Sequence, residues 1–393
     1  MKKAIIIVLD SMGIGALPDA ADYGDLGCNT LGHILAEMPH LNLPNLTALG
    51  LAKVMPALEE RKKREDLPYL ACAGILAEQS KGKDTITGHW EMTGVISEVP
   101  FPVFLNGIPE ELIKQLEEAC GVQFIGKEAA SGTEIIARLG EEHLATGKPI
   151  LYTSADSVLQ VAAHEETIPL DKLYWICEQI RATVQPPYEV ARVIARPFIG
   201  QPGNFQRTSN RHDYAVPIPQ TNLLQDLLRQ GYAVSGIGKI QDIFVGVELT
   251  NGKHTTSDAD GMEQLIAQYK AGQEGLIFVN LVDSDMKYGH RRDVEGYGNN
   301  LAAIDSKIGE LLDILDEETL LMITADHGCD PTAAGTDHTR ERVPFLAYSP
   351  SMQGCGKLDN TDTFAVIGAT IAENFGVEMP EGTIGVSFYD KLI

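Results

Sequence analysis

Two neighbouring segments near the C-terminal end of the chain combine residue types that bind divalent metal ions. Asp326 and His327 are adjacent and precede Gly328, and His338 follows Asp337 on the next segment. A carboxylate and an imidazole at one chain turn can reach the same cation, and a histidine on the next loop can complete another coordination sphere. Together the segments predict a metal centre, although any one histidine alone would be interpreted as an ordinary surface or core residue.

Further oxygen and nitrogen ligands come from Asp285 and His290, which flank Gly289, and from Asp10 near the N-terminus. With the residues above, this set is large enough to bind two ions. Mixed carboxylate and imidazole ligands without thiolate favour Zn²⁺ or Mn²⁺ over Ca²⁺, and the high share of carboxylates favours Mn²⁺. Cys329 lies beyond Gly328 and is interpreted as a bystander.

A hydroxyl group that one ion could activate is expected in the segment from Gly82 to Glu91, which contains Thr85 and Thr87. A helix N-terminus with free amides would suit phosphate oxygens there. The alternative is helix capping by Asp84 or a threonine, although no capping box completes it. The spacing alone chooses neither between nucleophile and cap nor between the two threonines.

Three short apolar runs could position these groups: Ala4 to Leu9, Leu276 to Val282, and Leu320 to Ala325. Such runs are typical of strands buried on both faces of a parallel sheet. Each is followed by acidic residues: Asp10, then Asp283 and Asp285, then Asp326. Because ligands of open α/β sheets gather outside the carboxyl ends of the strands, these acids are expected to meet at one edge.

Helical patterns over residues 301–315 and 364–375 alternate with the apolar runs, so the fold class is predicted to be α/β with a mostly parallel sheet. The middle of the chain has Pro-rich edges and mixed signals. We expect an inserted α+β domain over 99–215, and a core domain formed by 1–98 and 216–393. The length of 393 residues agrees with roughly two or three domains.

The charge balance excludes broad classes of partner. The chain has 55 acidic and 31 basic residues and a net charge of −24, so nucleic-acid binding is not expected. Basic residues are locally enriched around the insert: Arg192, Arg196, Arg207, Arg211 and Lys239. They predict that an anionic substrate group such as a phosphate binds there. The alternative is that they are ordinary solvated surface residues.

The sequence also indicates where the protein acts. No apolar stretch approaches the ~20 residues that cross a bilayer, and the N-terminal run lacks a cleavage site and ends at Asp10, so no membrane association is expected. The six cysteines are scattered without a Cys-x-x-Cys pair. They suggest no disulfide framework, and they predict a protein of the reducing cytoplasm.

With these residues assembled, the chain resembles the phosphopentomutase family of the alkaline phosphatase superfamily over nearly its whole length. The resemblance depends on the following segments: Asp10 to Gly15, Lys83 to Glu91, Val193 to Pro197, Arg207 to Tyr214, Gly289 to Asp293, and Thr324 to Gly328 with Gly335 to Arg340. Two departures are Ile86, where the family has threonine, and Cys329, where it has asparagine. Neither removes a ligand.

The resemblance implies the following roles. Thr85 is the phosphorylated residue; Asp10, Asp326 and His327 bind the metal beside it; Asp285, rather than Asp283, binds the second metal with His290 and His338. Ser154 and Asp156 match positions near substrate hydroxyls, and Arg192, Arg207 and Lys239 match positions near substrate phosphate. Mn²⁺ is the usual ion, the insert is a cap, and a hexose or pentose bisphosphate is the activator that primes Thr85.

The expected reaction is interconversion of (2-deoxy)ribose 1-phosphate and 5-phosphate through a pentose 1,5-bisphosphate, by a monomer or weak homo-oligomer. The rivals are a metal-dependent phosphomonoesterase or sulfatase-like hydrolase and a cofactor-independent phosphoglycerate mutase. A metal-binding scaffold without activity is a third alternative. The large insert and its arginines argue against the first, the motifs around Val193 and Arg207 against the second, and retention of Thr85 with every ligand against the third.

Overall fold

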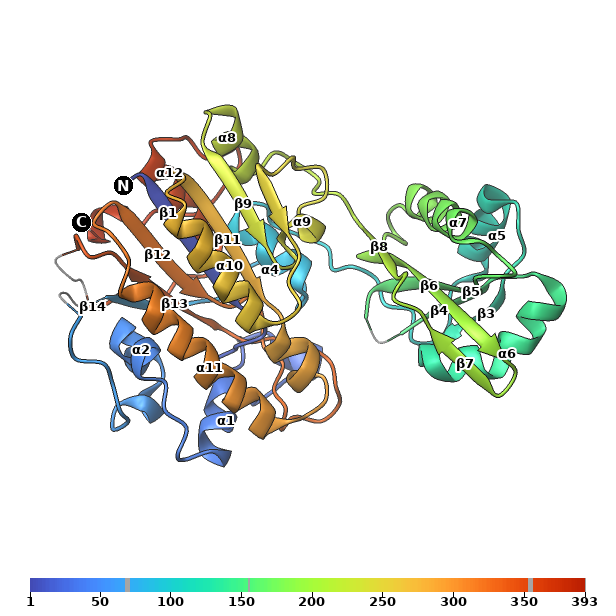
Figure 1. Cartoon of the computed structure of the whole chain (residues 1–393), viewed down its shortest axis with the longest axis horizontal. Helices are drawn as coiled ribbons and strands as arrows, with labels where there is room; N and C mark the ends of the chain where they lie inside the picture. The colour runs from blue at the N-terminus through green and yellow to red at the C-terminus, as the bar shows by residue number, and fades with distance from the viewer. Residues whose placement is uncertain (68–70, 155, 353–355, 393) are drawn as a thin grey trace. The chain divides into compact units, whose positions relative to one another are not determined.

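The computed structural model describes residues 1–392 except 68–70, 155 and 353–355. The described chain divides into two compact units, a core unit of Met1–Val99 with Ile218–Ile393 and an inserted unit of Pro100–Pro217. Each is described by itself (Figure 1).

The core unit is built on an eight-stranded sheet with the order β10-β9-β11-β1-β12-β13-β2-β14. The strands are β1 (Lys3–Leu9), β2 (Cys72–Leu76), β9 (Ala233–Ile237), β10 (Asn251–Lys253), β11 (Gly275–Leu281), β12 (Thr319–Thr324), β13 (Val343–Tyr348) and β14 (Gly356–Lys357). β1 pairs in parallel with β11 and β12, whereas β13 is antiparallel to both of its neighbours. The predicted α/β class with a mostly parallel sheet is confirmed.

The three central strands coincide with the predicted apolar runs to within a residue at each end. Nearly every side chain in them is buried, because helices cover the sheet. The register pairs Leu9 with Leu281 and Val8 with Thr324. Consequently the acids that follow the three strands emerge at one edge, as the sequence predicted.

Helices surround this sheet, and Figure 1 shows α10 and α11 lying across one of its faces. The helices of the core unit are α1 (Thr30–Glu37), α2 (Pro44–Leu46), α3 (Ala52–Val54), α4 (Thr85–Met92), α8 (Leu223–Arg229), α9 (Ile240–Ile243), α10 (Asp258–Lys270), α11 (Val294–Leu312), α12 (Ala365–Phe375) and α13 (Tyr389–Leu392). Short turns of other helical types are η1 (Ala20–Tyr23), η2 (Thr47–Leu51), η3 (Pro56–Leu58) and η4 (Ser284–Gly289). α11 and α12 account for the two predicted helical patterns.

A buried carboxylate, Glu341, ties together the loops at the site edge of the sheet. It accepts hydrogen bonds from the backbone amides of Gly15 and Thr30 and from the hydroxyls of Thr30 and Thr339. A Cβ atom at Gly13 would overlap this carboxylate. Gly13 is therefore required for the close approach of the Glu341 side chain and not only for a turn.

The inserted unit contains a six-stranded sheet with the order β3-β4-β5-β6-β7, and β8 pairs with β6. Its strands are β3 (Ile125–Ala129), β4 (Ile150–Thr153), β5 (Val158–His164), β6 (Arg192–Gln201), β7 (Asn204–Arg207) and β8 (His212–Ala215), and its helices are α5 (Glu110–Cys120), α6 (Gly132–Thr146) and α7 (Leu170–Thr183). Parallel and antiparallel pairs are mixed.

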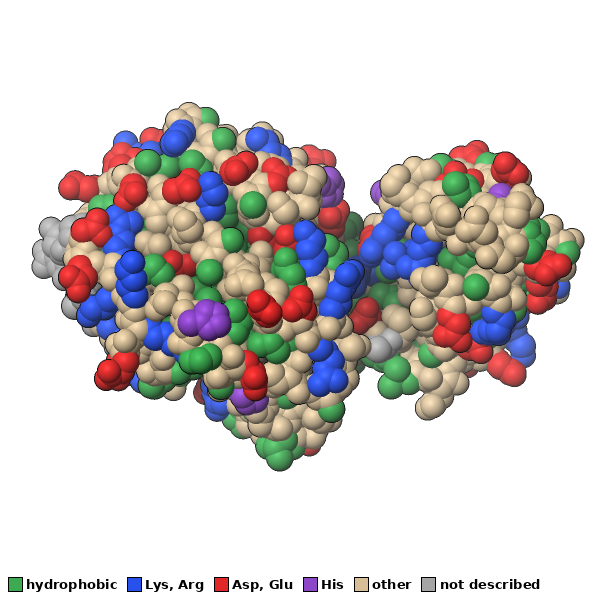
Figure 2. Space-filling view, turned by 60° about the horizontal axis from the view of Figure 1, so that its bottom comes forward, with side chains coloured by type: hydrophobic (Ala, Val, Ile, Leu, Met, Phe, Trp, Pro, Cys, Tyr) green, Lys and Arg blue, Asp and Glu red, His purple; other side chains and the backbone are tan. Residues whose placement is uncertain are grey.

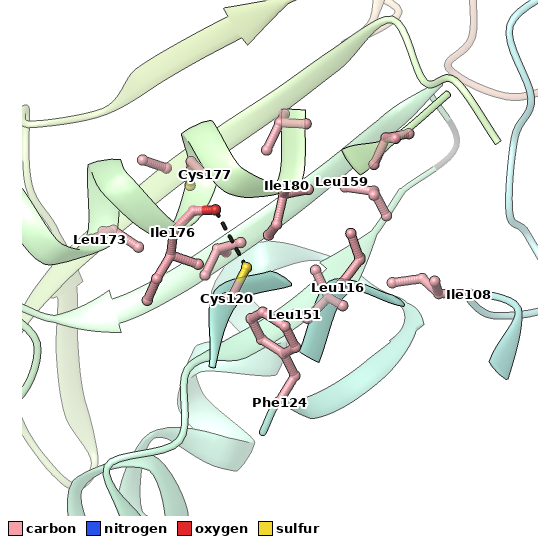
Figure 3. Packing of buried hydrophobic residues seen from close by; sticks show 14 of the residues in the cluster. Ile108, Leu116, Cys120, Phe124, Leu151, Leu159, Leu173, Ile176, Cys177 and Ile180 are labelled. Atoms are coloured by element: carbon pink, nitrogen blue, oxygen red, sulfur yellow. Dashed lines mark hydrogen bonds between the residues drawn. The ribbon is translucent and has the colours of Figure 1, made fainter. Parts of the chain in front are cut away.

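Both faces of this second sheet are covered, so the unit has a core on each side. α5 and α7 pack on one face around Leu151 (Figure 3), while α6 packs on the other against Ile150 and Tyr152. Successive residues of a strand point to opposite faces, which explains why neighbours on β4 belong to different cores.

The cysteines follow the prediction only in part. Cys28, Cys120, Cys177 and Cys329 are buried free thiols, but Cys72 is disulfide-bonded. The absence of Cys-x-x-Cys spacing therefore did not exclude a disulfide, because spacing in sequence says little about which strands and loops lie side by side. Cys355 lies outside the described residues.

The helices of the described part of the chain include none with the length and apolar character that a membrane span requires.

The core between α5 and α7 gives a test of stability. Ile176 is 0% exposed and Ile199, in the same unit, is 44% exposed. We expect Ile176→Ala to lower the free energy of unfolding of the inserted unit by ~2–5 kcal/mol, since truncation leaves a cavity, and Ile199→Ala to cost less than about 1 kcal/mol. Hydrogen–deuterium exchange of peptides from 100–217 during urea unfolding measures both. Equal effects would contradict the packing in Figure 3.

Candidate metal centre

Asp10, Asp326 and His327 form the first group of possible ligands, at the ends of β1 and β12. Nε2 of His327 lies 3.7 Å from Oδ1 of Asp10 and 3.4 Å from Oδ2 of Asp326. All three side chains are buried. Oδ1 of Asp10 and Oδ2 of Asp326 have no hydrogen-bond partner in the described part of the chain. A divalent cation would satisfy both atoms.

The other oxygen of each carboxylate is held by the protein. The backbone amide of Ser11 donates to Oδ1 of Asp326 over 3.0 Å, and Nδ2 of Asn280 donates to Oδ2 of Asp10 over 3.0 Å. Nδ1 of His327 lies 3.0 Å from the carbonyl oxygen of Gly328, so Nδ1 carries the proton and Nε2 presents its lone pair. Such contacts orient ligands before a cation binds.

Asp285, His290 and His338 form a second group beside the first. Nε2 of His290 and Nε2 of His338 each lie 3.3 Å from a carboxylate oxygen of Asp285. Nδ1 of His290 donates to the carbonyl of Thr336 and Nδ1 of His338 to that of Lys83. Both imidazoles therefore turn Nε2 toward Asp285, the arrangement that a second cation requires.

The two groups are contiguous. The rings of His327 and His338 stack with centroids 4.0 Å apart, and Asp285 lies close enough to His327 and His338 to share a cation with them. The structure thus brings together all six residues that the sequence proposed as ligands, and the chemistry of the donors fits Mn²⁺ or Zn²⁺.

Asp283, the neighbouring acid, is occupied elsewhere. Its carboxylate accepts from the amide of Asp258, Asp258 accepts from the amide of Asp283, and Lys287 donates to Asp283 over 2.8 Å. This reciprocal pair fixes the turn between β11 and η4. Asp285, two residues later in η4, then reaches His290 and His338.

Thr85 is the first residue of α4 and faces the first group. Its Oγ1 lies 3.3 Å from Nε2 of His327. Thr87 instead donates its hydroxyl to the carbonyl and carboxylate oxygens of Asp84. Gly88 allows α4 to bring Thr85 to this position, because a Cβ atom on residue 88 would lie 2.5 Å from the carbonyl oxygen of Asp326. Thr85, and not Thr87, is therefore the threonine whose hydroxyl faces the possible metal ligands, a choice that the spacing in sequence had left open.

Asp84 is the N-cap of α4, and its Oδ1 accepts from the amides of Ile86 and Thr87. Of the two alternatives that the sequence left open for this segment, the structure shows capping by Asp84, so these amides are not free for phosphate oxygens. The cap consumes them because an aspartate directly before a helix can reach both.

The electrostatics of the first group favour binding of a cation. Burial raises the pKa of Asp10 to about 6, although Lys239 lowers it. Burial and the charge of Asp10 raise the pKa of Asp326 well above its usual range. Burial, with His338, holds the pKa of His327 far below its ordinary value, so this imidazole is neutral. Carboxylates and a neutral imidazole in a dry site are a set of ligands for a cation.

The pKa of Asp285 has the opposite direction. Burial acts to raise it, but the adjacent imidazoles of His338 and His290 hold it well below the usual range. Asp285 is therefore the most strongly anionic group of the second set.

Lys239, proposed from the resemblance, lies at the same edge of the core unit, with Nζ 4.0 Å from Oδ2 of Asp10. Cys329, interpreted from sequence as a bystander, is close to the second group: Sγ lies 4.0 Å from Nδ1 of His290. Sequence position beyond Gly328 did not reveal this, because the turn brings the thiol back toward His290.

Sequence reasoning also missed His89 and Asn280. Both are fully buried, Asn280 beside Asp10 and His89 beside Asp326, and burial lowers the pKa of His89 to about 3. The four-residue spacing from Thr85 to His89 on one helix face was the available signal for His89. Asn280 lies inside an apolar strand, where a lone amide was itself unusual.

The inserted unit carries the basic cluster, and Figure 2 shows basic side chains gathered on one side of its surface. Arg211 and Arg192 both pair with Asp213, while Nε of Arg196 donates to Gln160 over 2.9 Å. Arg207 and Arg211 both help to lower the pKa of Arg196, although its burial contributes most. Ser154 is half-buried and Asp156 is exposed, at the end of β4.

Residues 2–379 match the Metalloenzyme superfamily. The chain is 50% identical over 392 residues to a phosphopentomutase of Carboxydothermus hydrogenoformans, and the match covers 100% of both chains. Among solved structures, it is similar to the PH0037 protein of Pyrococcus horikoshii, with 13% identity, a TM-score of 0.48 and coverage of 97% of this chain and 99% of that one. A phosphoglycerate mutase of Leishmania mexicana has 13% identity, a TM-score of 0.47 and coverage of 98% and 97%.

The full-length identity to the Carboxydothermus protein and the superfamily match lead to one conclusion: the chain belongs to the Metalloenzyme superfamily and, within it, is an enzyme of the phosphopentomutase family.

Proposed function

We propose that the enzyme interconverts (2-deoxy)ribose 1-phosphate and (2-deoxy)ribose 5-phosphate, with Thr85 as the phosphoryl carrier. The observation that carries the proposal is the position of Thr85 Oγ1, 3.3 Å from Nε2 of His327, beside two contiguous groups of metal ligands. A hydroxyl in this place is suited to accept and return a phosphoryl group.

The reaction balances in two transfers. Phosphorylated Thr85 first gives its phosphoryl group to the free 5-hydroxyl of the bound 1-phosphate, so one P–O bond to Thr85 breaks and one to the sugar forms. The product is a pentose 1,5-bisphosphate. After this intermediate turns around, or exchanges with another molecule, Thr85 Oγ1 takes the phosphoryl group from the 1-position, and the 5-phosphate leaves. A hexose or pentose bisphosphate primes Thr85 for the first cycle.

Two divalent cations, which we propose to be Mn²⁺, would supply positive charge to the phosphoryl oxygens and lower the pKa of the Thr85 hydroxyl. Asp10, Asp326 and His327 would hold one of them, and Asp285, His290 and His338 the other. The orphaned carboxylate oxygens of the first group support this assignment. So does the turning of His290 and His338 toward Asp285.

The inserted unit, proposed as a cap over 99–215, would bind the sugar phosphate and exclude water. Arg192 and Arg207 are the proposed phosphate ligands, Lys239 of the core unit assists them, and Ser154 and Asp156 contact sugar hydroxyls. Exclusion of water matters because water in place of the sugar hydroxyl would release phosphate. We further propose that the enzyme acts in the cytoplasm as a monomer or weak homo-oligomer.

The nucleophile is tested by the pair Thr85→Val and Thr87→Val, which remove one hydroxyl each. We expect Thr85→Val to abolish formation of ribose 5-phosphate and uptake of a phosphoryl group from glucose 1,6-bisphosphate, because no acceptor oxygen remains. Thr87→Val loses part of the helix cap but still becomes phosphorylated. Intact mass and peptide mapping give the result, and phosphorylation of the Thr85→Val protein would refute the assignment.

The metal stoichiometry is tested by removing one ligand from each group. We expect the native protein to retain about two Mn²⁺ per chain after dialysis, and Asp326→Asn and His338→Gln about one each. His254→Gln is the control, since His254 is 74% exposed in its side chain and belongs to neither group. Elemental analysis measures the ions, and unchanged occupancy in both ligand variants would contradict the two-site assignment.

The role of the insert is tested by Arg207→Ala. Loss of a charged hydrogen bond to phosphate is worth ~1.5–3 kcal/mol, so we expect kcat/KM for ribose 1-phosphate to fall about 10- to 100-fold. Arg138→Ala, which removes an exposed ion pair with Glu128 in the same unit, should leave it unchanged.

A mutase and a phosphomonoesterase are distinguished by measuring both ribose 5-phosphate and inorganic phosphate after the native enzyme is incubated with ribose 1-phosphate. Predominant phosphate release by the native enzyme would eliminate the mutase proposal.

A further inference from the structure

We infer that Asn280 is a positioning residue whose amide joins the Asp10 carboxylate to the His89 imidazole, and through His89 fixes the first turn of the helix that carries Thr85. Asn280 lies on β11 and His89 on α4, so one side chain links a sheet edge to a helix. The inference deepens the proposed function and rests on it for the role of Thr85.

The link is a continuous series of hydrogen bonds. Nδ1 of His89 lies 2.8 Å from the carbonyl oxygen of Thr85. Nε2 of His89 lies 3.3 Å from Nδ2 of Asn280, and the same Nδ2 lies 3.0 Å from Oδ2 of Asp10. All of these side chains except that of Thr85 are 0% exposed, so water does not compete for the contacts.

The acceptors determine where each proton lies. A carbonyl oxygen only accepts, so Nδ1 of His89 carries the ring proton, and Nε2 is an acceptor. Asn280 Nδ2 then uses one hydrogen for His89 and the other for Asp10. The reversed amide would place oxygen against two acceptors. Oδ1 of Asn280 has no partner in the described part of the chain, which agrees with an orientation set by its nitrogen.

The ring of His89 is also held from the side. It stacks on Phe278 with centroids 5.7 Å apart and an interplanar angle of 25°. Phe278 is two residues before Asn280 on β11, so both side chains project from the same face of the strand. This strand therefore fixes the plane of the imidazole and also the acceptor state of its Nε2.

The consequence for the site is geometric. Because Asn280 holds Oδ2 of Asp10, the unpartnered Oδ1 stays directed toward His327. Because His89 holds the carbonyl of Thr85, the backbone of the nucleophile keeps a fixed distance from the same carboxylate. A neutral amide suits this place, since it donates to both groups without adding charge.

The test uses the full-length enzyme and Asn280→Asp, which preserves shape but replaces the donor by an acceptor. We expect the affinity for the Mn²⁺ that Asp10 would bind, measured by calorimetry with Mn²⁺ alone, to fall about 10- to 100-fold. Other residues that hydrogen-bond to metal ligands have effects of this size. kcat should fall while KM for ribose 1-phosphate stays unchanged, because the Asn280 side chain is fully buried and is not accessible to a bound sugar.

Asn45→Asp is the matched control. Nδ2 of Asn45 donates to the carboxylate of Asp305 over 2.9 Å in the same unit, away from the ligand groups. Loss of this hydrogen bond should lower the free energy of unfolding but leave Mn²⁺ affinity and kcat unchanged. Equal Mn²⁺ affinity in Asn280→Asp and the native enzyme would overturn the inference.

A second measurement needs no Asn280 variant and holds even if that variant fails to fold. In native protein labelled with ¹⁵N-histidine, the His89 signal, assigned by its loss in His89→Asn, should show the tautomer with the proton on Nδ1. The Nε2-protonated tautomer would overturn the inference. Both readouts are independent of turnover, so a failure of the mutase proposal leaves them interpretable, and a failure here leaves native mutase activity intact.

Discussion

Buried carboxylates that meet at one edge of the sheet are the constraint on which the rest of the structure depends. Asp10 and Asp326 are fully buried, and each has one oxygen with no described partner. Burial raises the pKa of both. A protein that keeps such groups together without cations loses stability, so the site is built to be completed by them.

The surrounding groups serve this arrangement without neutralising it. The amides of Ser11 and Asn280 occupy one oxygen of each carboxylate and leave the other exposed to the cluster. Backbone carbonyls take the Nδ1 protons of His290, His327 and His338. The imidazole lone pairs are thereby directed inward before any ion arrives, which lowers the cost of ordering on binding.

Helix α4 joins Thr85, the proposed nucleophile, to the same network. Asp84 caps the helix and occupies the amides of Ile86 and Thr87, so these two amides are not free to bind an anion, whereas Lys239 lies beside Asp10. Gly88 allows the helix to approach the end of β12, and Glu341 holds the loops beside it.

The sequence by itself determined which strands carry the acids. Buried strands with short apolar runs are recognisable, and parallel register puts their carboxyl ends at one edge, so Asp10, Asp285 and Asp326 could be placed together in advance. It did not determine the contacts of Asn280, His89 or Cys329, nor that Asp84 consumes the helix amides. Those depend on distances between segments far apart in the chain, which only tertiary packing fixes.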